Sequence, residues 1–103
     1  MSVGKKDNTK ALLLLRERSV ISPSVFVEIV IWRVPSPLRG SSHTFKYRLA
    51  LITNEICVLR YDNEAGKGDH KHIDGEEVSF PFTTIEQLVD DFWRDVELRR
   101  KQQ

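Results

Sequence analysis

Apolar and polar positions follow two different spacings along this chain. Segments rich in leucine, β-branched or aromatic residues predict strands at residues 11–21, 25–34, 45–52 and 56–61. After residue 84 the spacing becomes helical, and one apolar stripe is formed by Ile85, Leu88, Val89, Phe92, Trp93 and Val96. Thr84 and Gln87 fit a capping box, so we expect a C-terminal amphipathic helix to begin beside them.

Residues 11–21 admit two interpretations. The run Ala-Leu-Leu-Leu-Leu has high helical propensity, and Thr9 could cap a helix there. However, Ser22-Pro23-Ser24 supplies turn residues that lead directly into the strand at 25–34. We favour a hairpin in which residues 11–21 form the first strand.

The remaining strands complete an α+β fold. Residues 25–34 are apolar at nearly every position, which is typical of a central strand covered on both faces. Residues 78–82 follow an Asp74-Gly75 turn and predict a short fifth strand, which Pro81 makes either an edge strand or an extended entry into the helix. We therefore predict an antiparallel sheet of four to five strands with the C-terminal helix packed on one face. Residues 10–103 would form a single domain after a flexible segment at 1–9.

A two-residue turn at Asn54-Glu55 would join the third and fourth strands. Counting back from this turn pairs Leu51 with Val58, Leu49 with Arg60 and Tyr47 with Asp62 on one face. On the other face the same count pairs Ile52 with Cys57, Ala50 with Leu59 and Arg48 with Tyr61. The open end of this hairpin would then gather polar side chains next to the segment that follows it. A one-residue slip would exchange the two faces.

Composition and charge narrow the function classes. The chain has 103 residues and a net charge of +1, so it is no general polyanion binder. Its longest apolar run, at 11–15, is far shorter than the roughly 20 residues that cross a bilayer, and no signal peptide is evident. The single Cys57 cannot form an internal disulfide. We expect a cytoplasmic protein that does not engage a membrane.

Residues 60–74 concentrate reactive side chains. They include two of the three histidines, two of the five glycines and three aspartates. If the chain is extended there, His70 and His72 point to the same side. Such a pair could move protons in RNA cleavage, in which a 2′-hydroxyl attacks the adjoining phosphate while a nearby cation stabilises the charge.

The candidate site residues follow from this chemistry. We predict His70, His72 and Lys67 as catalytic residues. Substrate or phosphate binding is assigned to Arg48, Arg60, Tyr61, Lys46 and Lys71. Supporting roles are assigned to Asp62, Asn63 and Asp69. His43 is interpreted as a loop residue.

The same residues admit three other interpretations. A metal site is disfavoured because lysines are interleaved with the candidate ligands Asp62, Asp69, His70, His72 and Asp74, so we expect neither a metal nor a cofactor. Gly66-Lys67-Gly68 lacks the full pattern of a nucleotide-binding P-loop. A non-enzymatic module that binds nucleic acid or protein through a solvated His/Lys loop is the alternative to catalysis.

Several motifs resemble the TumE family of small toxins from prokaryotic toxin–antitoxin modules. The resemblance covers about residues 10–98. The segments that carry it are Val27–Pro35, Phe45–Ala50, Arg60–Glu64, Lys67–His72 and the Phe82–Thr84 entry into the last helix. It implies a growth-inhibiting toxin neutralised by a cognate antitoxin, usually a helix-turn-helix protein.

By analogy with toxins of this size we expect an action on RNA or translation, as a small metal-independent ribonuclease. RNA is therefore a predicted partner. A second copy of the chain, forming a homodimer, is a further candidate partner.

Overall fold

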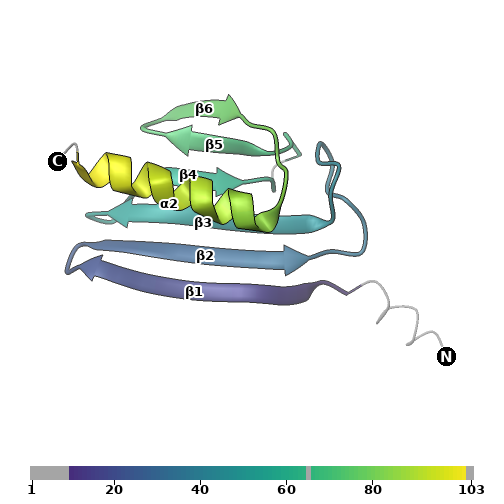
Figure 1. Ribbon diagram of the computed structural model, residues 1–103, viewed down its shortest axis with the longest axis horizontal. Helices are drawn as coiled ribbons and strands as arrows, with labels where there is room; N and C mark the ends of the chain where they lie inside the picture. The colour runs from purple at the N-terminus through teal and green to yellow at the C-terminus, as the bar shows by residue number, and fades with distance from the viewer. Residues whose placement is uncertain (1–9, 65, 102–103) are drawn as a thin grey trace.

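The computed structural model describes residues 10–64 and 66–101. One antiparallel sheet runs in the order β1-β2-β3-β4-β5-β6, and the helix α2 lies across one of its faces (Figure 1). The elements are β1 (Leu12–Ser22), β2 (Val25–Arg33), β3 (Phe45–Thr53), β4 (Ile56–Asp62), β5 (His70–Ile73), β6 (Glu76–Ser79) and α2 (Ile85–Lys101). The predicted α+β architecture is confirmed, with six strands rather than four or five. The expectation of a flexible segment at 1–9 falls outside the described residues.

The additional strand comes from the histidine-rich segment. Its last residues form β5, which pairs with β6 through a tight turn at Asp74-Gly75, where φ is 51° and 88°. Positive φ at both positions is typical of a two-residue hairpin turn whose twist matches its strands. The predicted strand at 78–82 is shifted, because β6 ends at Ser79 and Pro81 lacks the N–H needed to extend the ladder.

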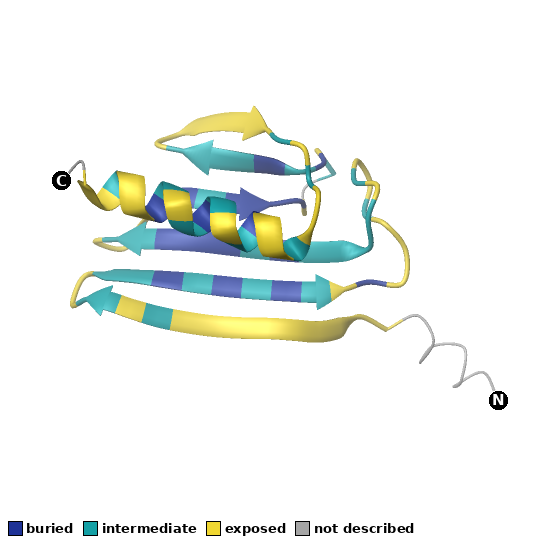
Figure 2. Cartoon of the chain, in the orientation of Figure 1, coloured by how far each residue is buried: buried dark blue, intermediate teal, exposed yellow. Residues whose placement is uncertain are grey.

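Residues 12–22 form strand β1 and not a helix. Pairing with β2 overrides the helical propensity of the leucine run, because β2 offers a full row of backbone partners. β1 is an edge strand, and its side chains from Leu12 to Leu15 are all exposed (Figure 2). The interpretation of β2 as covered on both faces is wrong, since Val30 and Trp32 lie half-buried on the face that α2 does not cover.

The Asn54-Glu55 turn is present, with φ of 51° and 69°. The predicted pairing holds for the two pairs next to it, Thr53 with Ile56 and Ile52 with Cys57. Beyond them a bulge at Val58 shifts the register by one residue, which corrects every remaining pair. The observed pairs are Leu51 with Leu59, Ala50 with Arg60, Leu49 with Tyr61 and Arg48 with Asp62.

The bulge has a functional effect, because it sorts the side chains of β3 and β4 by face. Tyr61 faces α2 together with Leu49, whereas Arg60 and Asp62 face the other way with Arg48. The predicted grouping of Tyr61 with Arg48 and of Asp62 with Tyr47 is therefore wrong.

The hydrophobic core lies between α2 and the sheet. Alternate residues of the middle strands meet Leu88, Phe92 and Val96 of the helix, which are buried. The strand residues in this core are Val27, Ile29, Ile31, Tyr47, Leu49, Leu51, Leu59 and Tyr61. The predicted cap is also present, since the backbone N–H of Gln87 donates to Thr84 Oγ1 at 3.0 Å. This core fixes the positions of β3, β4 and α2.

We call the opposite side of the sheet the open face, defined by Glu28 and Val30 of β2, Arg48 of β3, Arg60 and Asp62 of β4, and His70 and His72 of β5. Cross-strand partners share a face, so this assignment follows from the register. Among the described residues no helix covers the open face (Figure 1). Nor is any helix of the described residues long and apolar enough to cross a membrane.

Candidate functional site

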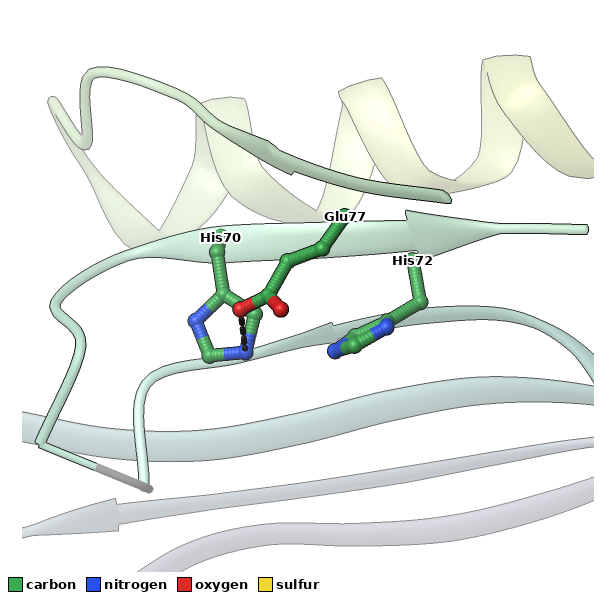
Figure 3. A group of neighbouring side chains, drawn as sticks. All are labelled: His70, His72 and Glu77. Carbon is green, nitrogen blue, oxygen red and sulfur yellow. Dashed lines mark ion pairs between the residues drawn. The ribbon is translucent and has the colours of Figure 1, made fainter. Parts of the chain in front are cut away.

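The strand register brings the predicted histidines and cations together on the open face. Asp62 is the direct partner of His70, and Arg60 is the direct partner of His72, across β4 and β5. Lys71 lies between the two histidines in the chain, and its side chain reaches Asp95 on α2. Because side chains alternate along a strand, both histidines must project away from α2. The expectation that they share one side is confirmed (Figure 3).

These side chains line a cleft of about 370 Å³. Its walls are Arg48, Arg60, Asp62, Glu64, Lys67, His70 and His72. The five predicted residues Arg48, Arg60, Lys67, His70 and His72 therefore meet in one place. Three permanent cations line the cleft, each paired with a carboxylate of Glu28, Asp62 or Glu77, and guanidinium and ammonium groups of this kind can bind a phosphate group.

His70 is held rigidly in this cleft. Its side chain is only 3% exposed, and its Nδ1 lies 2.9 Å from the carbonyl oxygen of Gly68. Its Nε2 lies 3.0 Å from Asp62 Oδ1 and 3.5 Å from Glu77 Oε2. A carbonyl and a carboxylate can only accept, so both ring nitrogens of His70 face hydrogen-bond acceptors of the protein.

His72 is held differently. It is half-buried, and its ring meets that of His70 edge to face with 5.1 Å between centroids. Its imidazole makes no hydrogen bond or ion pair with any residue that the structure describes. His72 thus has its nitrogens available for a substrate, whereas those of His70 are engaged.

Glu77 is a site residue that the sequence analysis missed. It is the direct partner of His72 across β5 and β6, and Lys67 Nζ donates to its Oε1 at 3.1 Å. That hydrogen bond is the main cause that holds the pKa of Glu77 below its usual range, and the nearby charges of Lys67 and the two histidines add to the effect. Counting back from the Asp74-Gly75 turn would have placed Glu77 opposite His72.

Arg60 lies on β4, between the histidines of β5 and Arg48 of β3. Its Nε lies 2.7 Å from Asp62 Oδ2, but the N–H is not aligned for a hydrogen bond, so the contact is an ion pair alone. Its side chain remains about one-third exposed. On β3, Arg48 lies 3.8 Å from Glu28, a weak exposed pair that leaves the guanidinium accessible. Both arginines can therefore turn toward an anion in the cleft.

Two predicted substrate-binding residues lie on the other side of the sheet. Tyr61 donates to Asp95 Oδ2 at 2.5 Å, and Lys71 Nζ donates to the same oxygen at 3.1 Å. Burial and this hydrogen bond raise the pKa of the Tyr61 hydroxyl well above its usual value. These contacts tie α2 to the sheet, so neither side chain reaches the cleft.

The other predicted residues lie at the rim or beneath it. Lys46 lies 3.7 Å from Glu64 at the edge of the cleft. The side chain of Asn63 is buried and bonds the backbone N–H of Tyr47 and the carbonyl of Phe45. These two bonds fix the chain where β4 ends.

Asp69 anchors a second network below the cleft. It accepts from the Tyr47 hydroxyl at 2.6 Å and pairs with His43 Nε2 at 2.8 Å. The His43 ring also stacks on Phe82 with 3.8 Å between centroids. The structure places His43 in a loop, as expected, and gives it a part in joining that loop to the segment before β5.

That junction depends on two glycines. Gly40 and Gly68 adopt φ of +90° and +81°, and a Cβ on Gly40 would stand 2.5 Å from the backbone nitrogen of Gly68. Only glycine permits both this conformation and this contact. The close approach fixes the carbonyl of Gly68, which in turn orients the ring of His70.

Comparison with known proteins identifies the family of the chain. A family model described as "Toxin TumE" matches residues 8–100, nearly the whole chain. No curated protein and no solved structure matches the chain. The family match confirms the resemblance that the sequence motifs suggested.

Proposed function

The chain belongs to the TumE family of toxins, and from that premise we propose that it acts by cleaving RNA in the cleft of the open face. It is thus a toxin component of a toxin–antitoxin module, with an antitoxin as its cognate partner. The observation that carries the RNA proposal is the pairing of an unengaged imidazole, His72, with three cations in one cleft. A helix-turn-helix antitoxin remains our expectation for the partner.

The proposed reaction is a transesterification at one phosphate. His72 accepts the proton of the 2′-hydroxyl as its oxygen forms a bond to phosphorus. The bond between phosphorus and the 5′ oxygen breaks, and the ammonium of Lys67 gives a proton to that leaving oxygen. Arg48 and Arg60 bind the non-bridging oxygens and offset the negative charge that develops on them. His72 then returns its proton to solvent, from which Lys67 regains one.

His70 has a different proposed role, although the sequence suggested it as a second proton-transfer residue. At 3% exposure its ring does not reach a substrate. Instead it holds the carboxylates of Asp62 and Glu77, which position Arg60 and Lys67 respectively. We therefore treat His70 as a positioning residue.

Cleavage of RNA by the purified chain in the presence of a chelator tests this proposal. His72→Asn should lower the rate by about 10²–10⁴-fold, the usual contribution of a general base. Lys67→Gln removes the proposed general acid and should also lower the rate. Lys101→Gln, which removes a lysine from the exposed end of α2, is its matched control and should leave the rate unchanged. The products should end in a 2′,3′-cyclic phosphate. Full activity of His72→Asn would contradict the assigned base.

A non-enzymatic role is the second candidate, because arginines extend along the open face beyond the cleft. Arg18 pairs with Glu28 at 3.7 Å, and Glu28 also meets Arg48. A row of arginines can bind a nucleic-acid backbone without breaking a bond. Salt-dependent RNA binding with no cyclic phosphate formed would support this candidate over catalysis.

A further inference from the structure

Three side chains on β5 and β6 bring metal-ligand atoms to one point. One ring nitrogen from each of His70 and His72 and one carboxylate oxygen of Glu77 all lie within 4.8 Å of one another. Figure 3 shows both imidazoles and the carboxylate projecting from neighbouring strands toward each other. Small movements of these side chains would bring all three atoms to bonding distance from a common centre.

The donor set selects a class of ion. Two imidazoles and one carboxylate suit Zn²⁺ and similar divalent transition metals, whereas Mg²⁺ and Ca²⁺ prefer oxygen ligands alone. Three protein ligands are also the usual number where a zinc ion keeps its fourth position for water. The cleft is open to solvent at the half-buried His72, so an ion has a path of entry.

The surroundings orient two of the ligands as outer-shell partners do in metal sites. The Nδ1–H of His70 donates to the Gly68 carbonyl, which leaves Nε2 as the nitrogen that faces the group. Lys67 holds Oε1 of Glu77, and Oε2 then faces His70. Hydrogen bonds of this kind fix the tautomer of a ligating histidine and the orientation of a ligating carboxylate.

The charge around the three ligands permits a cation. Lys67 and Arg60 oppose it, whereas Asp62 and Glu77 favour it, and Asp62 Oδ1 lies only 3.0 Å from His70 Nε2. A divalent ion would replace the proton on that nitrogen, and the carboxylate of Asp62 would then lie close to the metal instead. Of the two interleaved lysines that argued against a metal, Lys67 adjoins this point, whereas Lys71 projects to the α2 side.

We propose that His70, His72 and Glu77 form a binding site for one divalent transition-metal ion of the Zn²⁺ class. The ion takes the lone pair of His72 that RNA cleavage needs, so its binding switches cleavage off. This second clause rests on the proposed function, whereas binding of the ion does not. Binding of the metal ion therefore inhibits RNA cleavage in the same cleft.

Titration of the full chain with Zn²⁺ alone, followed by calorimetry, tests the site directly. We expect one ion per chain. His72→Asn and Glu77→Gln should each lower the affinity at least about 100-fold, no less than loss of an outer-shell partner does. Glu76→Gln is the matched control, because Glu76 is the neighbour of Glu77 that pairs with Ile73 and points to the other face. Circular dichroism would establish that each variant is folded.

A second site for zinc must be excluded, since Cys57 is an exposed free thiol. Cys57→Ser should bind Zn²⁺ as the natural chain does. Loss of binding in Cys57→Ser, or unchanged binding in both His72→Asn and Glu77→Gln, would overturn the metal site. If Zn²⁺ binds at the three ligands but leaves RNA cleavage intact, the metal site is supported and the proposed inhibition is refuted.

Discussion

His70 and Asp62 face each other across β4 and β5 with 3.0 Å between Nε2 and Oδ1, and both side chains are almost wholly removed from solvent. We expect Asp62→Asn to lower the free energy of unfolding by about 2–3 kcal/mol, because a buried imidazole loses its charged acceptor. Urea denaturation measures this. Asp91→Asn weakens a pair on α2 with Arg94, whose side chain is 65% exposed, and should cost less than about 1 kcal/mol.

A double-mutant cycle with His70→Asn and Asp62→Asn would isolate the pair. The two substitutions should be non-additive by about 0.5–3 kcal/mol. Strict additivity would show that the two side chains do not stabilise each other.

The pKa values of the two tyrosines predict how the stability of the fold changes at alkaline pH. Burial, followed by hydrogen bonds to Asp69 and Asp95 respectively, raises the pKa of both Tyr47 and Tyr61 far above the ordinary value of 10.0. The unfolded chain then loses these protons first, so the contribution of the two tyrosines to stability is constant below pH 10 and falls as pH rises above it. The slope should reach about 1.4 kcal/mol per pH unit for each tyrosine.

Tyrosinate absorbance provides the measurement, because the chain has only these two tyrosines. Absorbance should appear together with unfolding, in one step. A tyrosinate signal near pH 10 from a chain that circular dichroism shows to be folded would contradict the prediction.

The helix start gives a prediction with a neighbouring control. Thr84→Ala removes the oxygen that accepts from the N–H of Gln87, and should cost about 1 kcal/mol of stability. Thr83→Ala makes the same chemical change one residue earlier at an equally exposed position and should have little effect. Thermal unfolding of the two variants compares them. Equal losses would mean that the cap at Thr84 contributes nothing specific.

Alanine substitutions at Gly75 and Gly40 distinguish the energetic cost of an unfavourable φ from the cost of a steric clash. Gly75→Ala places a Cβ in open space at φ +88°, so only the conformational cost of about 1–2 kcal/mol applies. Gly40→Ala carries a similar cost plus the collision with Gly68, which adds about 1–3 kcal/mol. Because Gly68 orients His70, Gly40→Ala should also lower RNA cleavage, while Gly75→Ala should not. Equal stability of the two variants would refute the close approach.

Salt dependence tests the open face as an RNA surface. Arg48→Ala should weaken RNA binding and reduce the slope of log affinity against log salt by about one, the effect of losing one phosphate contact. Arg94→Ala removes an exposed arginine from α2, on the other side of the sheet, and should change neither. Identical slopes for Arg48→Ala and the natural chain would remove Arg48 from the surface.

The sequence predicted the helix, the Asn54-Glu55 turn and three of the long strands because each has a strong local signal, whereas residues 11–21 were favoured as a strand only through the turn that follows them. It did not predict the bulge at Val58, since no residue pattern marks a single extra position in an apolar strand. That one residue decided that Tyr61 faces α2 and that Arg60 and Asp62 face the cleft. Local propensity therefore placed β2, β3 and β4, whereas register decided which residues share a site.

The β5–β6 hairpin shows a second limit. Its strands have four residues each and carry histidines and glutamates, so they lack the apolar alternation by which strands are recognised. Their pairing comes from the tight turn at residues 74 and 75 and from neighbouring β4. The chemistry of residues 60–74 was apparent in the sequence, but Glu77 was not, because its place in the site depends on a partner across the sheet.

The division of the sheet into a core face and an open face has a consequence for genetics. Strand residues that alternate along β3, β4 and β5 serve either the core or the cleft, but seldom both. A selection for cells that survive expression of this toxin should therefore return two kinds of missense mutant. Changes such as Leu49→Pro should remove the protein from the cell, whereas changes such as His72→Asn should leave it abundant, folded and harmless.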